Sequence, residues 1–385
     1  MREIDVIIDS YETAKSADVP CVLATVVHVE GSSYRRAGAR MLIDENGLMT
    51  GAISGGCLEG DALRKALHAL HKSKNKLVTY DTSDEEDAVI GAQLGCNGVI
   101  QVLFEPIDFK YEENPIELLK QANREKKLMI IGTFFHLEKS KDQIGTTFLI
   151  DEDLQIHGKE LEPKLNNQLT ADCKSAFEDN ASLFREYAVD QERHYVFLEV
   201  FSRPTMLVLV GAGNDAQMLA QMAEVLGWDI VVTDGRPTHA SSDRFASSCQ
   251  VVVAKPEEVL HQIEVTNRTA FVLMTHNYAY DLSVLKALLN KSEIPYIGIL
   301  GPKKKYQRML DDLANEGIEL NEDQLAKIHA PVGLEIGAET PAEIGLSILS
   351  EIQSVLAGTK GGKLKEKEGP IHLKKNNEFK RIIIE

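Results

Sequence analysis

The feature that most constrains the fold is a glycine-rich turn in the second half of the chain, VLVGAGNDAQMLA at residues 208–220. An apolar strand candidate runs into Gly211 and Gly213, and Ala216 stands at the start of a helix-like stretch. Asp234 ends the next strand candidate, about 20 residues further on. Glycines at this spacing let the backbone approach a pyrophosphate at a helix N-terminus, while the carboxylate binds a ribose hydroxyl. The turn therefore predicts a strand–helix–strand unit of a parallel sheet.

Strand and helix candidates alternate from residue 205 to residue 358, as is typical of a doubly wound α/β sheet. The strand candidates are 206–213, 229–234, 250–254, 269–277 and 295–301, and 340–358 is a candidate for a closing helix. We therefore expect a Rossmann-like domain over 205–358, with NAD(P) or another nucleotide as a candidate ligand. The fold alone does not identify the ligand, because it serves many purposes.

Two further side chains near the expected nucleotide site can contribute to ligand binding. Arg236 follows Asp234 and can accept a 2′-phosphate or form a local salt bridge. His276 stands near the end of the 269–277 strand candidate, where open parallel sheets bind their ligands. It can act as a general acid or as a metal ligand, whereas a single histidine is more often only hydrogen-bonded.

The first 204 residues contain short strand candidates and a weak internal repeat. TVVHVE (25–30) matches TFFHLE (133–138), and MLIDEN (41–46) matches FLIDED (148–153). A helix-like stretch near 164–186 follows the second copy, as LEGDALRKALHALHK follows the first. We expect an α+β domain over 1–204 with an internal duplication, its two related αβ units lying at about 15–106 and 125–204. Chance similarity between two hairpins is the alternative.

The last segment, 359–385, differs in composition from both domains. Its lysines, glutamates and glycines are typical of a linker. It ends in KRIIIE, which predicts a short strand that pairs with an exposed sheet edge. A disordered tail is the alternative.

Cys57 follows Gly55 and Gly56 and precedes an amphipathic helix candidate, in SGGCLE at 54–59. At a helix start, unpaired N–H groups and the helix dipole favour a thiolate, which binds soft metals. The glycines allow a tight turn and a close approach of a bulky ligand. Glu59 suits the first helical turn but opposes thiolate formation, so the net effect on the thiol stays open. The alternative is a small buried cysteine that caps a packed helix.

The loop GSSYRRAG (31–38) supplies two hydroxyls and two guanidinium groups. These groups belong to Ser32, Ser33, Arg35 and Arg36. Together with loop N–H groups they can cradle a phosphate or a carboxylate; an exposed hairpin with solvated arginines is the alternative. Cys96, in LGCNG (94–98), is a second thiol in a glycine-flanked turn. The sequence leaves its distance from Cys57 open.

Charge and cysteine usage exclude several classes of protein. A formal net charge of −17 at pH 7 argues against a general nucleic-acid or anionic-membrane binder. No apolar run approaches the ~20 residues that span a bilayer. The five cysteines are an odd number, far apart and without a CxxC pair, which argues against a disulfide framework and a zinc site. We therefore expect a cytoplasmic protein without a membrane span or a nucleic-acid partner.

Taken in order, the motifs resemble those of the XdhC/CoxI family, accessory factors for xanthine dehydrogenase and related molybdenum hydroxylases. The motifs are GSSYRRAGARML, GAISGGCLEGD, LGCNG, LVGAG, VTDGR, THNYAYD, IGILGPKKK and PVGLEIGAETPAEIGLSIL, and the resemblance spans nearly all of 15–357. Cys57 matches the cysteine of the family's GGC-x-E element, Glu59 its acid, and Cys96 the cysteine of a second glycine turn. The family's basic loop is matched by Ser32, Ser33, Arg35 and Arg36.

The resemblance implies that the chain binds molybdenum cofactor (molybdopterin), with Cys57 as the candidate ligand of molybdenum. It also implies that the chain supports sulfuration of the cofactor by a cysteine desulfurase and delivers it to an apo-molybdenum hydroxylase. This is the work of an accessory factor rather than of an enzyme. Two other classes stay open, an NAD(P)-dependent oxidoreductase and a docking scaffold for the hydroxylase. A homodimer suits the two-domain arrangement.

Overall fold

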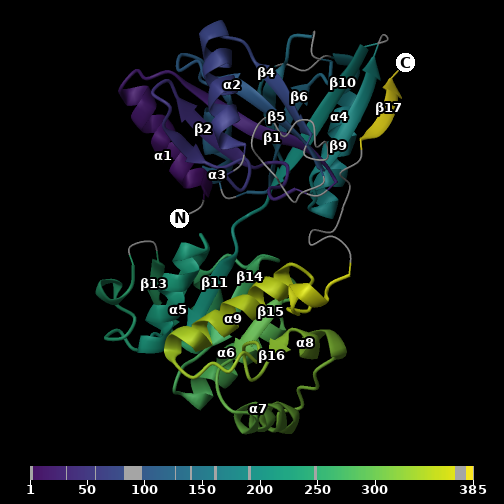
Figure 1. The fold of residues 1–385 in the computed structure, drawn as a ribbon. Coiled ribbons are helices and arrows are strands. Elements are labelled where there is room, and N and C mark those ends of the chain that lie inside the picture. Colours follow the sequence, from purple (N-terminus) through teal and green to yellow (C-terminus); the bar gives the residue numbers. More distant parts are fainter. Residues whose placement is uncertain are drawn as a thin grey trace. The chain divides into compact units, whose positions relative to one another are not determined.

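The computed structural model describes residues 3–31, 33–56, 58–81, 98–125, 127–138, 141–159, 163–189, 192–246, 249–368 and 379–384. These residues form two units (Figure 1). One contains residues 3–203 and the C-terminal strand, and the other contains residues 204–368. Within the described part of the chain, no helix is both long enough and apolar enough to cross a membrane.

In its described residues, the unit over 204–368 has a six-stranded parallel sheet in the order β13-β12-β11-β14-β15-β16. The strands are β11 (Met206–Val210), β12 (Asp229–Asp234), β13 (Cys249–Val253), β14 (Thr269–Leu273), β15 (Tyr296–Ile299) and β16 (Ile328–His329). The helices are α5 (Asn214–Val225), α6 (Tyr278–Leu289), α7 (Lys303–Asn315), α8 (Glu322–Ala326) and α9 (Pro341–Leu356). β11 is wholly apolar and contributes to the clusters on both faces of the sheet, as a strand between two helical layers must. The predicted Rossmann-like sheet is confirmed.

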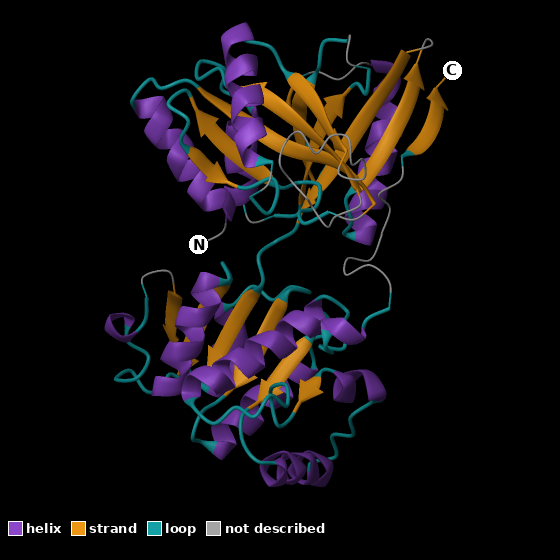
Figure 2. Ribbon diagram, in the orientation of Figure 1, coloured by secondary structure: helices purple, strands orange, loops and turns teal. Residues whose placement is uncertain are grey.

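The other unit contains two antiparallel sheets (Figure 2). In the described residues, sheet A has the strand order β3-β2-β1-β5-β4, and sheet B has the order β17-β9-β10-β6-β7-β8, in which only β17 runs parallel to its neighbour. The first set of elements is α1 (Glu3–Ser16), β1 (Cys21–Gly31), β2 (Arg40–Asp44), β3 (Met49–Gly51), α2 (Glu59–Lys72), β4 (Lys76–Asp81) and β5 (Gly98–Pro106). The second set is α3 (Pro115–Arg124), β6 (Met129–Phe135), β7 (Gly145–Asp151), β8 (Ile156–Gly158), α4 (Pro163–Asp179), β9 (Leu183–Val189) and β10 (Glu192–Phe201), followed at the end of the chain by β17 (Lys380–Ile384).

Without β17, the two sheets have the same topology. In each, a helix precedes three strands, which are followed by a second helix and two more strands. β1 corresponds to β6, β2 to β7 and β5 to β10, and the corresponding strands pair in the same order. The weak sequence repeat therefore reflects a duplicated αβ unit rather than a chance likeness of two hairpins.

Each copy covers one face of its sheet with its own helix and shares the other face. α2 packs on sheet A, and α4 packs on sheet B. The faces that the two copies share contain the cluster Val27, Leu103, Phe135, Phe184 and Phe197. The rings of Phe184 and Phe197 stack with their centroids 4.9 Å apart. Burial of these side chains from both copies holds the copies together.

The prediction of one helix over 164–186 is wrong in its last third. α4 ends at Asp179, Asn180 takes a left-handed conformation with φ of 44°, and residues 183–189 form β9. A residue in this conformation ends a helix in the way that a C-terminal glycine does. Arg185, Tyr187 and Val189 then alternate with the less buried Glu186 and Ala188, which is the period of a strand rather than a helix.

Two glutamates, Glu105 and Glu199, join the copies in a reciprocal way. Glu105, at the end of β5, accepts hydrogen bonds from the N–H (2.6 Å) and the Oγ1 (2.9 Å) of Thr146 at the start of β7. Burial raises the pKa of Glu105, and the hydrogen bonds from Thr146 oppose that rise. Glu199 on β10 pairs with both terminal nitrogens of Arg40 at the start of β2. Each copy thus holds the second strand of the other.

A glycine with positive φ lies against each of these carboxylates. Gly38 has a φ of 90° and Gly145 a φ of 96°. A Cβ on Gly38 would overlap Oε1 of Glu199, and a Cβ on Gly145 would overlap Oε1 of Glu105. Glycine is therefore needed at both places for two reasons, the backbone conformation and the close approach of a carboxylate.

We predict that Gly145→Ala destabilises this unit by about 3 kcal/mol, because it adds displacement of a buried, hydrogen-bonded carboxylate to backbone strain. Gly47→Ala is the control, since Gly47 also has positive φ (85°) but its Cβ would only reach Leu63 at 3.7 Å. It should cost about 1 kcal/mol. Urea unfolding monitored by circular dichroism measures both. The single tryptophan, Trp228, reports separately on the other unit and should not change. Equal losses in the two variants would contradict the role of Glu105.

Candidate functional site

The glycine turn before α2 is closed by a serine–glutamate pair. Ser54 Oγ accepts hydrogen bonds from the N–H groups of Gly56 (3.2 Å) and Leu58 (3.1 Å) and donates to Glu59 Oε2 (2.6 Å). Glu59 Oε1 also accepts from the N–H of Ser54 (3.0 Å). This arrangement satisfies donors at the helix start in the manner of a cap. The carboxylate of Glu59 is therefore committed to the shape of the turn.

The turn leaves its glycine backbone accessible. Gly56 has a φ of 106°, and a Cβ placed on it would have no atom of the described chain within 4 Å. A Cβ on Gly55 would meet the ring of Tyr34 at 3.2 Å. Tyr34 belongs to the basic loop and is 72% exposed. The loop and the turn, which are about twenty residues apart in sequence, thus lie side by side.

Glu3 at the start of α1 ties the same two segments together. Its Oε2 accepts from Arg35 Nη1 at 3.0 Å, and its Oε1 accepts from the N–H of Ala52 at 3.2 Å. Arg35 and Glu3 are each more than a third exposed, so the ion pair positions the loop more than it stabilises the fold. The sequence alone did not single out Glu3 or Tyr34. An acidic residue far from the loop carries no local signal of this pairing.

The basic loop contains shielded polar atoms without partners. Ser33 Oγ and Arg35 Nε are hidden from solvent and make no hydrogen bond to other described residues. Arg36 is exposed. Shielded donors without partners are unusual in folded chains, and a ligand oxygen is one group that can satisfy them.

The opposite copy holds the base of this loop. Arg40 Nη1 donates to the carbonyl oxygen of Gly38 at 2.9 Å and also to Glu199 Oε1 at 3.0 Å. The side chains of Arg40 and Glu199 are 5% and 14% exposed. A charge-assisted pair at this depth constrains the backbone where the loop joins β2.

The predicted residues Cys57, Cys96 and Ser32 lie outside the described residues. Their chain neighbours are described: Gly56 and Leu58 flank Cys57, and Gly98 follows Cys96 by two positions. Gly98 pairs with Gly31 at the start of the basic loop. In the described part of the chain, no group of three or more His, Cys, Asp or Glu side chains is arranged to hold a metal ion.

In the Rossmann-like unit, the two fingerprint glycines have different surroundings. Gly211 has a φ of 124°, and a Cβ there would lie 2.8 Å from the backbone of Met274. Gly213 precedes α5 and has open space around it, while Ala216 is fully buried. The first glycine is thus required by the packing of the turn against β14, and only the second leaves room for a ligand.

The carboxylate at the end of β12 is already saturated. Asp234 accepts hydrogen bonds from the N–H of Ala212 (3.0 Å) and from Arg236 through its N–H, Nε and Nη2 (2.9, 2.9 and 2.7 Å). Burial alone would raise the pKa of Asp234, but the bonds from Arg236 and Ala212 lower it to about 2. A ribose would have to displace Arg236 to reach this carboxylate.

His276 is exposed, whereas the nearest acidic residue along the chain, Asp281, is buried. Asp281 is fully buried and accepts from Thr275 Oγ1 (2.5 Å) and Lys305 Nζ (2.7 Å). Burial raises the pKa of Asp281 and the bonds from Lys305 and Thr275 oppose it. Lys305 is therefore engaged in an internal ion pair and is not available to a ligand at this edge of the sheet.

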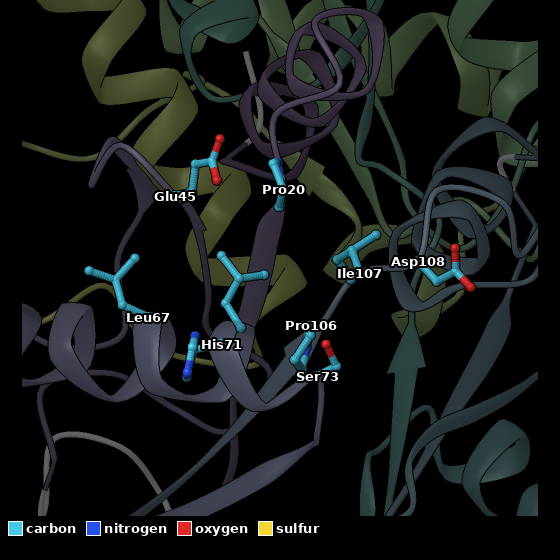
Figure 3. A pocket seen from close by; sticks show the side chains of 9 residues that line it. Pro20, Glu45, Leu67, His71, Ser73, Pro106, Ile107 and Asp108 are labelled. Atoms are coloured by element: carbon cyan, nitrogen blue, oxygen red, sulfur yellow. The ribbon is translucent and has the colours of Figure 1, made fainter.

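A surface cavity of about 690 Å³ lies at the other end of α2 from the glycine turn (Figure 3). It is lined by Pro20, Glu45, Leu67, Leu70, His71, Ser73, Pro106, Ile107 and Asp108. Among the described residues, none of those predicted from the sequence lines it. Since α2 has 14 residues, the cavity and the turn are separated by about 20 Å along the helix.

Comparison with known proteins gives matches over most of the chain. The family model for the XdhC Rossmann domain matches residues 207–352, and that for the XdhC and CoxI family matches residues 14–81. A probable xanthine dehydrogenase subunit from Bacillus subtilis is 30% identical over 335 residues, 86% of this chain and 92% of that protein. The molybdenum cofactor insertion chaperone PaoD of Escherichia coli is 24% identical over 335 residues, 87% of this chain and 83% of that protein.

A solved structure matches both units. The crystal structure of a xanthine dehydrogenase from Bacillus halodurans superposes with a TM-score of 0.72 at 28% identity, covering 96% of this chain and 98% of that chain. Together with the identity and coverage of the Bacillus subtilis relative, this match extends the likeness from motifs to the whole architecture. The chain belongs to the XdhC and CoxI family.

Proposed function

We propose that this protein binds molybdenum cofactor and delivers it to a molybdenum hydroxylase of the xanthine dehydrogenase type. Two relatives carry names that support this role, a molybdenum cofactor insertion chaperone and a probable xanthine dehydrogenase subunit. The observation that carries the proposal is that the basic loop lies against the glycine turn. The ring of Tyr34 lies next to Gly55, and Glu3 accepts hydrogen bonds from both Arg35 and the N–H of Ala52.

The described residues fit a bulky anionic cofactor. A phosphate can satisfy the shielded Ser33 Oγ and Arg35 Nε, and Arg36 adds positive charge at the surface. The open backbone at Gly56 leaves space for a bulky group beside the start of α2. When bound, the cofactor supplies a soft metal centre that a thiolate can bind, and Cys57 is the residue we assign to it.

The chain's own residues divide the work. Arg35 is oriented by Glu3, so its guanidinium does not have to be ordered when the anion binds. Glu59 and Ser54 hold the turn in which Cys57 stands, and the start of α2 favours its thiolate. Ser32 and Cys96 complete the proposed site, Cys96 as a second thiol near the strand end that pairs with Gly31.

The finer parts of the role follow from the same chemistry. We propose that the chain supports sulfuration of the bound cofactor by a cysteine desulfurase and then transfers the cofactor to the apo-hydroxylase. The protein then acts as a maturation factor, and the xanthine dehydrogenase names of its relatives describe the enzyme that it serves. We propose a homodimer as its assembled form.

We predict that Cys57→Ser reduces affinity for purified molybdenum cofactor by at least about tenfold, because a hydroxyl is a poor ligand for a soft metal. Cys249→Ser, in the Rossmann-like unit, is the matched control and should retain affinity. Co-elution of cofactor in gel filtration, quantified by elemental analysis for molybdenum, measures binding. Unfolding curves establish that both variants are folded. Unchanged affinity of a folded Cys57→Ser variant would remove Cys57 from the site.

An NAD(P)-dependent oxidoreductase is the alternative that the open backbone at Gly213 favours. The saturated Asp234 opposes it, because the carboxylate that would recognise a ribose is already bonded to Arg236. We therefore predict no saturable binding of NADH or NADPH in the micromolar range. A titration monitored by calorimetry tests this, and a dissociation constant below about 100 μM for either would revive the oxidoreductase.

A further inference from the structure

The C-terminal strand is an addition to the duplicated unit. β17 pairs in parallel with β9, from Lys380 opposite Arg185 to Ile384 opposite Val189 (Figure 1). In sheet A, the corresponding edge strand is β4, and within the described residues no strand lies beyond it. Sheet A thus has the five strands of the duplicated unit and, within the described residues, no counterpart of β17. β17 therefore resembles a bound ligand more than a core strand.

A single aromatic side chain anchors this segment. Phe379, just before β17, enters the cluster between the two sheets. Its ring centroid lies 4.3 Å from that of His28 and 5.0 Å from that of Tyr195. Phe135 and Phe184 complete what we call the aromatic socket. Ring contacts of this kind contribute about 0.5–1.5 kcal/mol each beyond the buried area.

The remaining residues of the segment hold it less firmly. Ile382 and Ile384 pack at the margin of the cluster under α4, whereas Ile383 is 71% exposed. Arg381 lies 3.6 Å from Glu186 but is half-exposed, and such pairs contribute at most about 1 kcal/mol. A strand of five residues at a sheet edge, held by one anchor, can be exchanged for another extended segment, as in β-strand addition.

The socket adjoins the proposed cofactor site. His28, which contacts Phe379, lies on β1 three residues before Gly31. Gly31 begins the basic loop and pairs with Gly98 at the start of β5. A segment that replaces Phe379 therefore changes the packing of the strand that carries the loop. Because β1 connects the socket to the basic loop, the partner that fits this surface is one that receives the cofactor proposed to bind at the loop.

We propose that the outer edge of β9 and the aromatic socket form a strand-recognition surface, which residues 379–384 fill until an extended segment of the client hydroxylase replaces them. The matching segment has an aromatic residue, a basic residue two positions later to face Glu186, and aliphatic residues three and five positions after the aromatic. Naming the hydroxylase as the partner rests on the proposed function, whereas the surface itself does not.

The surface is tested with the full chain and a fluorescent peptide, NNEFKRIIIE, that reproduces residues 376–385. Phe379→Ala should bind this peptide about tenfold more tightly than the wild-type chain, whose own tethered segment competes at millimolar effective concentration. Backbone amides of β9 should exchange hydrogen faster in Phe379→Ala. The control is Ile156→Ala, an exposed residue on β8 at the opposite edge of sheet B, which should change neither.

Two results would overturn the surface. If Phe379→Ala neither binds the peptide more tightly nor exposes β9, residues 379–384 are a fixed part of the fold. If the variant loses the cooperative unfolding of its whole unit, the strand is structural rather than a replaceable ligand. The peptide with its own phenylalanine changed to alanine should bind at least about tenfold more weakly, and equal binding would remove the socket from recognition.

The partner is tested separately with the apo-hydroxylase. It should bind Phe379→Ala more tightly than wild type and should displace the labelled peptide. Peptide binding without any hydroxylase binding would refute the proposed partner and leave the surface intact. A wild-type dimer that Phe379→Ala converts to monomer would assign the surface to strand exchange between two copies of this chain and overturn the hydroxylase as its occupant.

Discussion

The largely buried ion pair between Arg40 and Glu199 is the contact on which the proposed site depends. Glu199 belongs to the second copy of the duplicated unit, while Arg40 stands at the end of the basic loop in the first. Both side chains are largely removed from water, so neither charge can be left alone without a large cost. The pair therefore obliges the two copies to pack in one register, and with them the backbone of the loop from Gly38 onward.

The duplication explains why one copy carries chemistry and the other does not. The contacts are reciprocal: Glu105 accepts a hydrogen bond from Thr146 at the start of β7, and Glu199 accepts one from Arg40 at the start of β2. The functional groups are not reciprocal, because the loop with Arg35 and Arg36 occurs only in the first copy. The second copy thus works as a scaffold, and its contribution to the site is positional. A single unit would leave Arg40 and the shared aromatic cluster exposed.

Most of the fold could be predicted from local patterns. The glycine turn at 211–213 and the alternating elements after it predict the parallel sheet, and the two short matched blocks predict the duplication. The end of α4 could not be predicted, because a weak helical periodicity continues past Asp179. The left-handed conformation of Asn180, which ends the helix, is not encoded by a local sequence pattern. The terminal strand could be proposed, but its partner β9 depends on which sheet edge is available in three dimensions.

The site was only partly predictable for a similar reason. The basic loop and the glycine turn can be recognised in the sequence by their residue types. Their proximity depends on the tertiary structure and could not be predicted. Glu3 and Glu199 join the loop to distant elements, and nothing in the sequence around them distinguishes them from surface acids. Asp234 shows the reverse, because here the sequence predicted a function that the structure does not favour. The dinucleotide-binding motif is complete, but the carboxylate of Asp234 is already hydrogen-bonded to Arg236.

The most direct measurement compares the affinity of Glu199→Gln and Glu105→Gln for molybdenum cofactor, at a temperature where circular dichroism shows both to be folded. The two glutamates occupy equivalent places in the copies, and only Glu199 holds the base of the basic loop. The account predicts that Glu199→Gln weakens binding by about tenfold while Glu105→Gln leaves it within about twofold of wild type. Equal effects of the two substitutions, or none from Glu199→Gln, would contradict it.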